Sequence, residues 1–335
     1  MFRTPTLLAF AASALIATTA QAQTWTPTAA LPPGTVGALA QNGTSTLAAM
    51  FYGSMHFSPN YGASWSAVGP AGAQVVTLHN ANGTFYAGLN GVGSTLPGMI
   101  YRSTNGTVWT QSLANAASLG RILALASGST GSDPYVLAGT NKGVMRLAVN
   151  TNTWSAANTG LPVVGGNAKQ VISLAAMGTR VYAGVLGNGV YQSNDGGLTW
   201  FSIGLPGKTI HSLLITAVNG TTFLAGGVSG PEGVWKKVGN GPFAVLNTGI
   251  LPNPNMGARD ILALHLRGGT VFAGQLRANV VSQMPTNGTI WSAANAGLPP
   301  PNFGFVARAF SSNGCAMFVG TDIGVRKWVH TPGNC

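Results

Sequence analysis

Charged side chains, and carboxylates above all, are scarce in this chain. Asp and Glu together number 5 against 16 Lys and Arg, and charged residues make up 6% of 335 residues, whereas an average soluble protein has roughly 25%. The formal net charge of +11 therefore reflects a lack of acids more than a wealth of bases. A basic balance of this origin is poor support for nucleic acid, and we expect no nucleic-acid partner.

Cysteine and long apolar runs are also rare. Beyond the N-terminus no segment is apolar for long enough to cross a bilayer, so we expect no transmembrane segment in the mature chain. The two cysteines are Cys315 and Cys335. In an oxidising compartment their pairing would tie the C-terminal tail to the last repeat, and two free thiols are the alternative.

The N-terminus has the pattern of a bacterial secretory signal. Arg3 supplies the positive start, residues 7–17 are largely apolar, and Ala20-Gln21-Ala22 offers small residues for cleavage. We therefore predict a signal peptide over residues 1–22 and a mature chain that is secreted or periplasmic. A membrane-spanning interpretation of the same stretch is less favoured, because the apolar run is short.

Repeated units of about 39 to 51 residues follow this segment. The clearest unit, Val171 to Pro206, contains four short strand-like runs separated by Gly, Asn and Asp turn signals. Four antiparallel strands in a repeat of this length are typical of one β-propeller blade. The sequence therefore predicts an all-β propeller, most simply of seven blades, in a single domain over residues 23–335. First strands open at Val36, Val75, Ile122, Val171, Ile210, Ile261 and Val306.

Two positions recur inside the repeats. Second strands carry a small pair such as Ala183-Gly184, which lets neighbouring backbones approach where the sheets converge on the axis. Fourth strands open on an aromatic residue such as Trp200. Residues Trp25 to Pro32 have the pattern of a fourth strand alone, while the last repeat supplies three strands. We expect the N-terminal strand to complete the final blade and close the ring.

One segment connects the chain to a known group of proteins. The segment SNDGGLTW matches the pattern Ser-x-Asp-x-Gly-x-Thr-Trp, with a near match at Ser58 and an eroded copy at Ser103. The chain thereby resembles the Asp-box, or BNR, repeat propellers, which include sialidases, xyloglucan hydrolases and photosystem II assembly factors. The resemblance implies a structural hairpin, held by the carboxylate, and is uninformative about activity. Its residues here are Ser193, Asp195, Gly197, Thr199 and Trp200.

Catalytic chemistry has few residues on which to rest. A glycosidase needs two carboxyl groups across the scissile bond. Asp260 alone among the acids stands at the start of an inner strand, so Asp260 with Glu232 is the pair that a diverged glycoside hydrolase or sialidase-like enzyme would use. We carry over no catalytic residue from the resemblance, because nothing in the sequence matches the first sialidase arginine motif.

The histidines show no spacing typical of a metal site, so we predict no metal and no cofactor. His79 and His265 each follow the Leu that ends an inner-strand motif and so occupy equivalent positions in two blades. We expect hairpin histidines there, with a matched pair of ligands as the alternative.

Basic residues precede four consecutive inner strands, at Arg121, Lys169, Lys208 and Arg259, the last followed by Asp260. Inner strands begin at one face beside the central channel, so these residues would form a cationic arc that attracts an acidic glycan, a phosphate or an acidic peptide surface. Solvated loop cations are the alternative. We expect a monomeric, non-catalytic binding or assembly module for a protein or acidic glycan ligand. A carbohydrate-active enzyme and a factor that assists a membrane complex are the rival hypotheses.

Overall fold

A computed structural model provides the three-dimensional description of the chain. It describes residues 24–51, 53–69, 74–90, 98–113, 120–218, 221–228, 232–253, 257–276, 280–299 and 306–329. The predicted signal peptide over residues 1–22 and the predicted disulfide partner Cys335 lie outside these ranges. No helix in the described part of the chain is long and apolar enough to cross a membrane.

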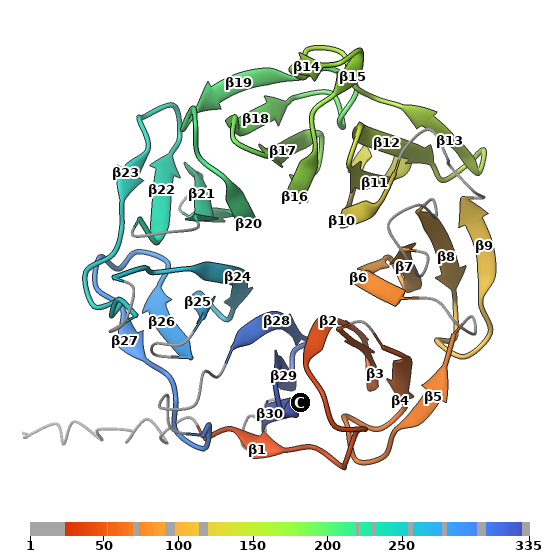
Figure 1. The fold of residues 1–335 in the computed structure, drawn as a ribbon, viewed down its shortest axis with the longest axis vertical. Coiled ribbons are helices and arrows are strands. Elements are labelled where there is room, and N and C mark those ends of the chain that lie inside the picture. Colours follow the sequence, from red (N-terminus) through yellow and green to blue (C-terminus); the bar gives the residue numbers. More distant parts are fainter. Residues whose placement is uncertain are drawn as a thin grey trace, which may run out of the picture.

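Seven four-stranded antiparallel sheets are arranged around a central axis (Figure 1), which confirms the predicted propeller. We number the blades 1 to 7 in chain order. Within each blade the first strand lies innermost and the fourth lies at the rim (Figure 1). The inner strands are β2 (Val36–Asn42), β6 (Gln74–Ala81), β10 (Ile122–Thr130), β16 (Val171–Met177), β20 (Ile210–Val218), β24 (Ile261–Arg267) and β28 (Ala307–Ser312).

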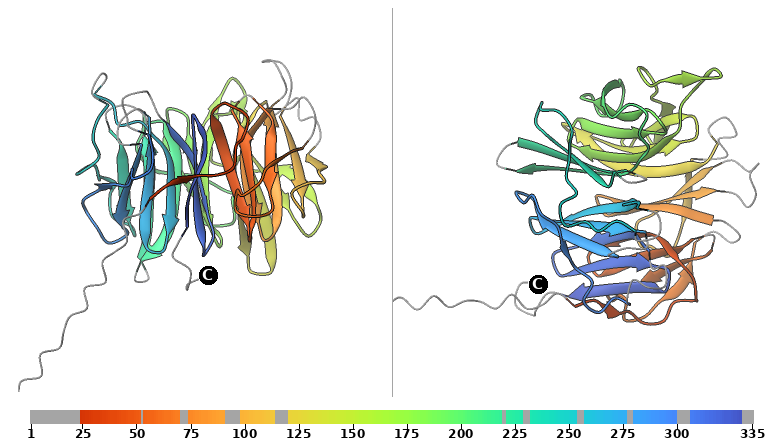
Figure 2. Two further views of the ribbon diagram at one scale, coloured as in Figure 1. Left: turned by 90° about the horizontal axis from the view of Figure 1, so that it is seen from below. Right: turned by 60° about the vertical axis from the view of Figure 1, so that its left-hand side comes forward.

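The remaining strands follow the same order in each blade. Seen from the side, the blades stand next to one another across a ring whose loops project from its two faces (Figure 2). The second strands are β3 (Ser45–Met50), β7 (Thr84–Asn90), β11 (Asp133–Thr140), β17 (Arg180–Val185), β21 (Thr221–Val228), β25 (Thr270–Gln275) and β29 (Ala316–Thr321). The third strands are β4 (Met55–Ser58), β8 (Met99–Ser103), β12 (Gly143–Ala148), β18 (Gly189–Ser193), β22 (Val234–Val238), β26 (Val281–Pro285) and β30 (Gly324–Val329).

The fourth strands are short and largely exposed, and the seventh comes from the N-terminal part of the chain. In blade 7, β1 pairs antiparallel with β30, with Thr26 opposite Lys327 and Pro27 opposite Arg326. Closure of the ring by this N-terminal strand stays a prediction. The fourth strands are β5 (Ser66–Val68), β9 (Thr110–Leu113), β13 (Thr153–Ala156), β19 (Phe201–Gly204), β23 (Ala244–Val245), β27 (Ser292–Ala293) and β1 (Thr26–Pro27).

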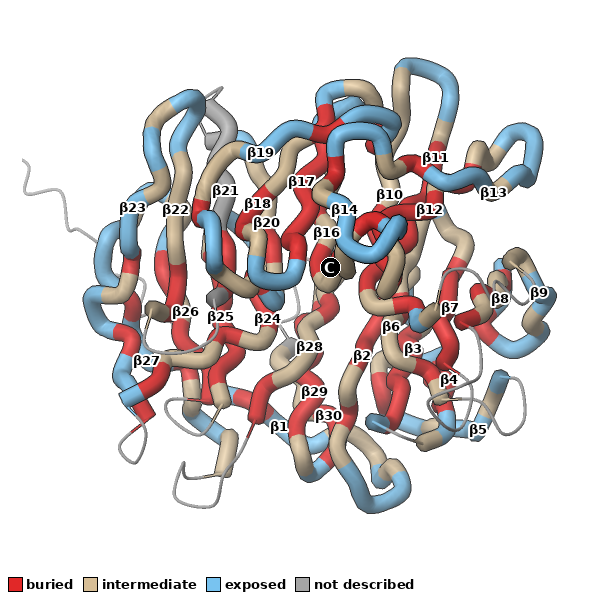
Figure 3. The backbone as a smooth tube through the Cα atoms, turned by 45° about the horizontal axis from the view of Figure 1, so that its top comes forward, coloured by how far each residue is buried: buried red, intermediate tan, exposed pale blue. Residues whose placement is uncertain are grey.

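The hydrophobic core lies between the blades. One cluster, for example, joins Tyr135 and Leu137 of blade 3 to Val171, Val181 and Trp200 of blade 4. Buried residues therefore follow the middle of the strands, while the loops and rim strands are exposed (Figure 3). Burial of apolar surface between sheets contributes about 25 cal/mol for each Å², so each blade is stabilised mainly by its neighbours.

The small pair of the second strands sits at the tightest contact between blades. A Cβ atom added at Gly139 would lie 2.6 Å from the carbonyl oxygen of Val171, the first residue of the next inner strand. One added at Gly184 would lie 2.7 Å from the carbonyl oxygen of Ile210. Glycine is therefore needed where the backbones of adjacent blades meet, as the sequence pattern predicts.

Every inner strand carries a β-bulge near its start, at its second residue or, in β6, at its third. The pairing to the second strand skips one residue in each blade, so that this residue has no partner and the strand bends. The bulge places seven residues of varied chemistry at the same level of the ring. They are Gly37, Val76, Leu123, Ile172, His211, Leu262 and Arg308.

Candidate functional site

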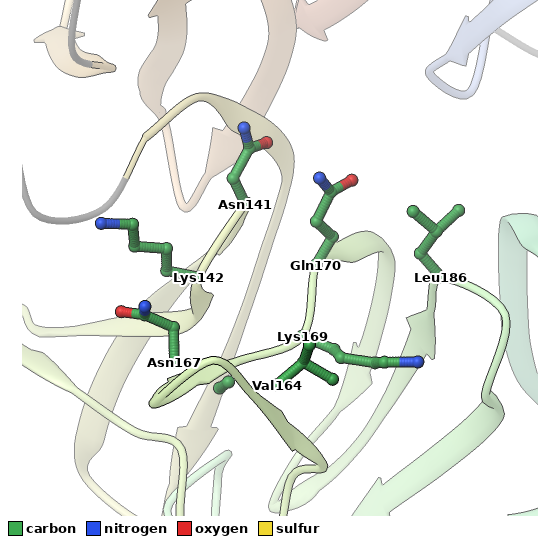
Figure 4. A pocket seen from close by; sticks show the side chains of 8 residues that line it. Asn141, Lys142, Val164, Asn167, Lys169, Gln170 and Leu186 are labelled. Atoms are coloured by element: carbon green, nitrogen blue, oxygen red, sulfur yellow. The ribbon is translucent and has the colours of Figure 1, made fainter.

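A pocket of about 380 Å³ opens between blades 3 and 4. It lies at the face of the ring at which the inner strands begin, which we call the channel face. Three segments form it: the loop between β11 and β12, the connection from blade 3 to blade 4, and the loop after β17 (Figure 4). Its lining consists of Asn141, Lys142, Val164, Asn167, Ala168, Lys169, Gln170 and Leu186.

An extra hairpin builds one wall of this pocket. The connection from blade 3 to blade 4 forms two short strands, β14 (Val163–Val164) and β15 (Asn167–Ala168), in which Val163 pairs with Ala168. Two glycines with positive φ, Gly165 at 58° and Gly166 at 78°, make the turn between these strands. The side chain of Val164 is 61% exposed, so the hairpin presents an apolar residue to solvent beside the pocket.

Lysines and amides dominate the chemistry of the lining. The Asn141 and Gln170 amides point the same way, whereas the Lys142 and Lys169 side chains diverge to opposite sides (Figure 4). The Lys169 ammonium donates a hydrogen bond of 2.7 Å to Oδ1 of Asn188, in the loop between β17 and β18. The residues that line the pocket include no carboxylate and no aromatic ring, so its electrostatic potential favours an anionic ligand.

Two of the other three basic residues of the predicted arc, Lys208 and Arg259, bond to groups in their own surroundings. Lys208 forms an ion pair with Glu232. Nε of Arg259 donates to the carbonyl oxygen of Ile250 at 3.1 Å. Arg121 is exposed. Only Lys169 lines the pocket itself, and the arc as a whole stays a proposal.

The structure gives the two acids of the enzyme hypothesis different partners. Glu232 is paired with Lys208. The backbone carbonyl of Asp260 accepts a hydrogen bond of 3.1 Å from the Leu276 amide. Burial lowers the pKa of His211, the bulge residue of blade 5, and the negative charge of Asp260 opposes that shift. The Asp260 carboxylate therefore acts electrostatically on a nearby histidine.

The hairpin from Ser193 to Trp200 is held by its own polar side chains. Oδ1 of Asp195 accepts hydrogen bonds from the Leu198 and Thr199 amides, both at 3.0 Å, and from the Ser193 hydroxyl at 2.6 Å. Burial raises the pKa of Asp195, but hydrogen bonds from Ser193, Thr199 and Leu198 outweigh it and bring the pKa to about 2. The carboxylate thus uses its hydrogen-bonding capacity within the turn, in agreement with a structural role.

Asparagine supports the same turn in two other blades. In blade 1, Oδ1 of Asn60 accepts from the Ser64 amide at 2.9 Å, and the Ser58 hydroxyl bonds the same oxygen at 3.0 Å. In blade 2, Oδ1 of Asn105 accepts from the Thr107 and Val108 amides. The near match and the eroded copy in the sequence therefore keep the hydrogen bonds of the hairpin.

The two matched histidines join neighbouring blades. Nε2 of His79 lies 2.8 Å from Oγ of Ser127 in blade 3, and Nε2 of His265 lies 2.7 Å from Oγ of Ser312 in blade 7. Both lie in the inner strands, β6 and β24, of the hairpins that these strands form with β7 and β25. Among the described residues no group of three His, Cys, Asp or Glu side chains is placed to hold a metal ion.

Sequence reasoning identified Lys169 but missed the pocket around it. The sequence did contain a signal for the extra hairpin. The first strands of blades 3 and 4, at Ile122 and Val171, are 49 residues apart, whereas those of blades 4 and 5, at Val171 and Ile210, are 39 apart, so blade 3 and its connection have room for an insertion. Lys142 and Asn141 gave no signal of their own, because a Thr-Asn-Lys-Gly sequence reads as an ordinary turn.

Comparison with known proteins adds information about the fold. No family model matches the chain, and no curated protein matches it either. Among solved structures, the GH74 xyloglucanase of Xanthomonas campestris has a TM-score of 0.63 and 15% identity over 90% of this chain. The Niastella koreensis GH74 enzyme has a TM-score of 0.62 and 16% identity over 91% of this chain. This chain spans 53% of the length of each of those two enzymes.

A third solved structure is similar over nearly its whole length. The structure of YCF48 bound to a D1 peptide has a TM-score of 0.62 and 11% identity, with 90% of this chain and 95% of that chain covered. At these identities the similarity is one of fold alone. The chain is a seven-bladed β-propeller with the architecture of GH74 and YCF48 propellers.

Proposed function

We propose that the protein is a secreted, non-catalytic binding propeller that holds an acidic peptide segment of a partner protein in the pocket between blades 3 and 4. The observation that carries the proposal is the lining itself. It combines two lysines with three side-chain amides and no carboxylate. Lysine ammonium groups bind carboxylates as point charges, and the pocket volume of about 380 Å³ lies in the range typical of ligand sites.

The lining suits a peptide better than a sugar. Side-chain amides such as those of Asn141 and Gln170 both donate and accept hydrogen bonds, as peptide groups do. The partly exposed Val164 and Leu186 offer apolar contacts on the same rim. The lining has no aromatic ring on which a sugar would stack. A propeller of the same fold has been seen with a peptide bound, namely YCF48 with the D1 peptide.

Export and the family assignment are part of the same proposal. Residues 1–22 would be removed as a signal peptide, and Cys315 in the β28–β29 hairpin would pair with Cys335. The shared hydrogen bonds of the Ser193, Ser58 and Ser103 hairpins support assignment of the repeats to the Asp-box group. A similar fold occurs in the extracellular domain of BT3049 from B. thetaiotaomicron, with a TM-score of 0.61, which fits an exported chain.

The test is a binding measurement on the protein without residues 1–22. An array of ten-residue peptides, graded from no acidic residue to five, would be titrated against the wild type and the Lys142→Gln/Lys169→Gln double variant. We expect affinity to rise with acidic content and to fall at least tenfold in the double variant. The matched control is Lys237→Gln, because that ammonium bonds the Gly241 carbonyl near the rim and should leave binding unchanged.

A diverged hydrolase is the second candidate, and GH74 similarity of fold is what favours it. It would be tested by turnover on a panel of glycans that includes xyloglucan. Activity that is lost in both Asp260→Asn and Glu232→Gln would defeat the binding proposal. Peptide binding without turnover, abolished by the lysine variants, would support it.

A further inference from the structure

The hairpins between the third and fourth strands of blades 1 to 4 pack against the preceding blade. At the junction of blades 3 and 4, Nε of Arg146 donates to the Gly196 carbonyl of the hairpin at 3.0 Å. A Cβ atom on Gly197 would lie 2.9 Å from the Leu137 side chain, which shows how closely the turn fits there.

Two further junctions repeat the hydrogen bond from the third strand. Nη1 of Arg102 in blade 2 donates to Oδ1 of Asn152 in the blade 3 hairpin at 2.9 Å. Nζ of Lys327 in blade 7 donates to the Tyr61 carbonyl in the blade 1 hairpin at 3.4 Å. A hydrogen-bond donor on the third strand of one blade therefore recognises the turn of the next.

Blade 7 has no hairpin of this kind in the described chain, because its fourth strand is β1 and not a continuation of β30. A pocket of about 470 Å³ lies at the junction of blades 6 and 7, where the hairpin would sit. Gln283 lines it and pairs across from Phe272, as Arg146 pairs across from Leu137. The pocket therefore lies where a blade 7 hairpin equivalent to that of blade 4 would pack, and we call it the seat.

The residues around this seat differ from their counterparts in blade 4 in a way that suits a ligand. Trp328 stands where Ser193 stands in blade 4, since it pairs with Met317 as Ser193 pairs with Val181. A tryptophan cannot hold the turn amide as Ser193 does. The guanidinium of Arg267 lies over the Trp328 ring, 4.5 Å from its centroid, and both side chains line the pocket.

We propose that this seat binds an acidic, glycine-containing turn of another polypeptide. A turn carbonyl would accept a hydrogen bond from the Gln283 amide, as the Gly196 carbonyl does from Arg146. The carboxylate of the turn would lie beside Arg267, and no carboxylate lines the pocket to oppose it. The site lies where the inner strands end, opposite the channel face, and does not depend on the function proposed above.

The experiment uses a cyclic peptide of the sequence Ser-Asn-Asp-Gly-Gly-Leu-Thr-Trp, which is the protein's own blade 4 hairpin. Binding would be measured by calorimetry and by the NMR shift of the Trp328 indole. We expect saturable binding that weakens at least tenfold in Gln283→Ala and in a peptide with Asn for Asp. The matched control is Gln192→Ala, at the equivalent position of blade 4, where the side chain bonds Asn194; it should bind as the wild type does.

Three results would overturn the proposal. One is the absence of saturable binding to a variant set whose thermal unfolding matches the wild type. The second is binding that Gln283→Ala leaves unchanged. The third is binding that appears only after deletion of residues 330–335, which would show that the chain's own residues after Val329 fill the seat.

Discussion

The indole nitrogen of Trp25 donates a hydrogen bond of 2.8 Å to the carbonyl oxygen of Ala294, across the junction of blades 6 and 7. The same relationship joins Trp200 of blade 4 to Ala157 of blade 3, at 2.9 Å. Trp25 therefore occupies in blade 7 the place that an internal tryptophan occupies in blade 4. The N-terminal segment thus makes with blade 6 the contact that Trp200 of blade 4 makes with blade 3.

This equivalence predicts a large loss of stability in Trp25→Ala. The side chain is 1% exposed, and removal of a buried tryptophan typically costs about 3–5 kcal/mol. We expect a loss of that size in the free energy of unfolding, measured by urea denaturation. Trp109→Ala is the control, because that half-buried ring bonds a carbonyl of its own blade and should cost less. A loss below about 1 kcal/mol in Trp25→Ala would contradict a role in closing the ring.

The fold could be predicted because its signals repeat. The small pair at Ala183-Gly184 and the aromatic residue at Trp200 recur in most units, since each blade meets the same two constraints at the axis and at the rim. The bulges gave no such signal. Their positions are filled by residues as different as Gly37, His211 and Arg308, because a bulge leaves its residue out of the strand pairing and so does not require one residue type.

The candidate sites were harder to predict, because the residues that meet in them are far apart in the sequence. His79 and His265 were matched by position, but the serines that they contact are 48 and 47 residues away. The seat beside Gln283 lies at the one junction where the described part of the chain forms no hairpin between a third and a fourth strand. An absence of this kind becomes visible only when the blades stand side by side.

The inter-blade histidines predict a pH dependence of stability. Burial lowers the pKa of His79 to about 4, and burial with the nearby Arg267 charge lowers that of His265 to about 4. In the unfolded chain both pKa values return to about 6.5. Between pH 6.5 and 4 the unfolded chain binds more protons than the folded chain, so stability falls as the pH falls. The loss is up to about 3 kcal/mol for each histidine.

The measurement is urea denaturation at intervals from pH 7.5 to 4 on the wild type and on His79→Gln/His265→Gln. Glutamine does not titrate, so we expect a flatter profile in the double variant over this interval. The control is His211→Gln, which should leave most of the slope in place. Parallel profiles for the wild type and the double variant would refute the assignment.

The Ser193 hairpin predicts a graded response at Asp195. Asparagine keeps one acceptor oxygen, as Asn60 does in blade 1, whereas alanine removes every acceptor from the turn. We expect Asp195→Asn to cost less than about 1 kcal/mol and Asp195→Ala to cost about 1–3 kcal/mol, both at pH 7. The pKa of about 2 is below the ordinary value of 3.8, so the advantage of Asp over Asn should be lost as the pH falls from 4 to 2. Equal stability of all three proteins at pH 7 would contradict this.

The corner after blade 3 predicts a site where alanine is not tolerated. Gly160 has a φ of 90°, and a Cβ atom there would lie 1.9 Å from the carbonyl oxygen of Trp200. Because that oxygen belongs to a backbone fixed by the Trp200 hydrogen bonds, the clash cannot be relieved by a side-chain movement. Gly165 also has a positive φ, 58°, but a Cβ atom would meet nothing within 4 Å. We expect Gly160→Ala to lower the free energy of unfolding by about 3 kcal/mol or more, and Gly165→Ala by about 1 kcal/mol from backbone strain alone. Equal losses in the two variants would show that strain, and not contact between blades, sets the need for glycine at this corner.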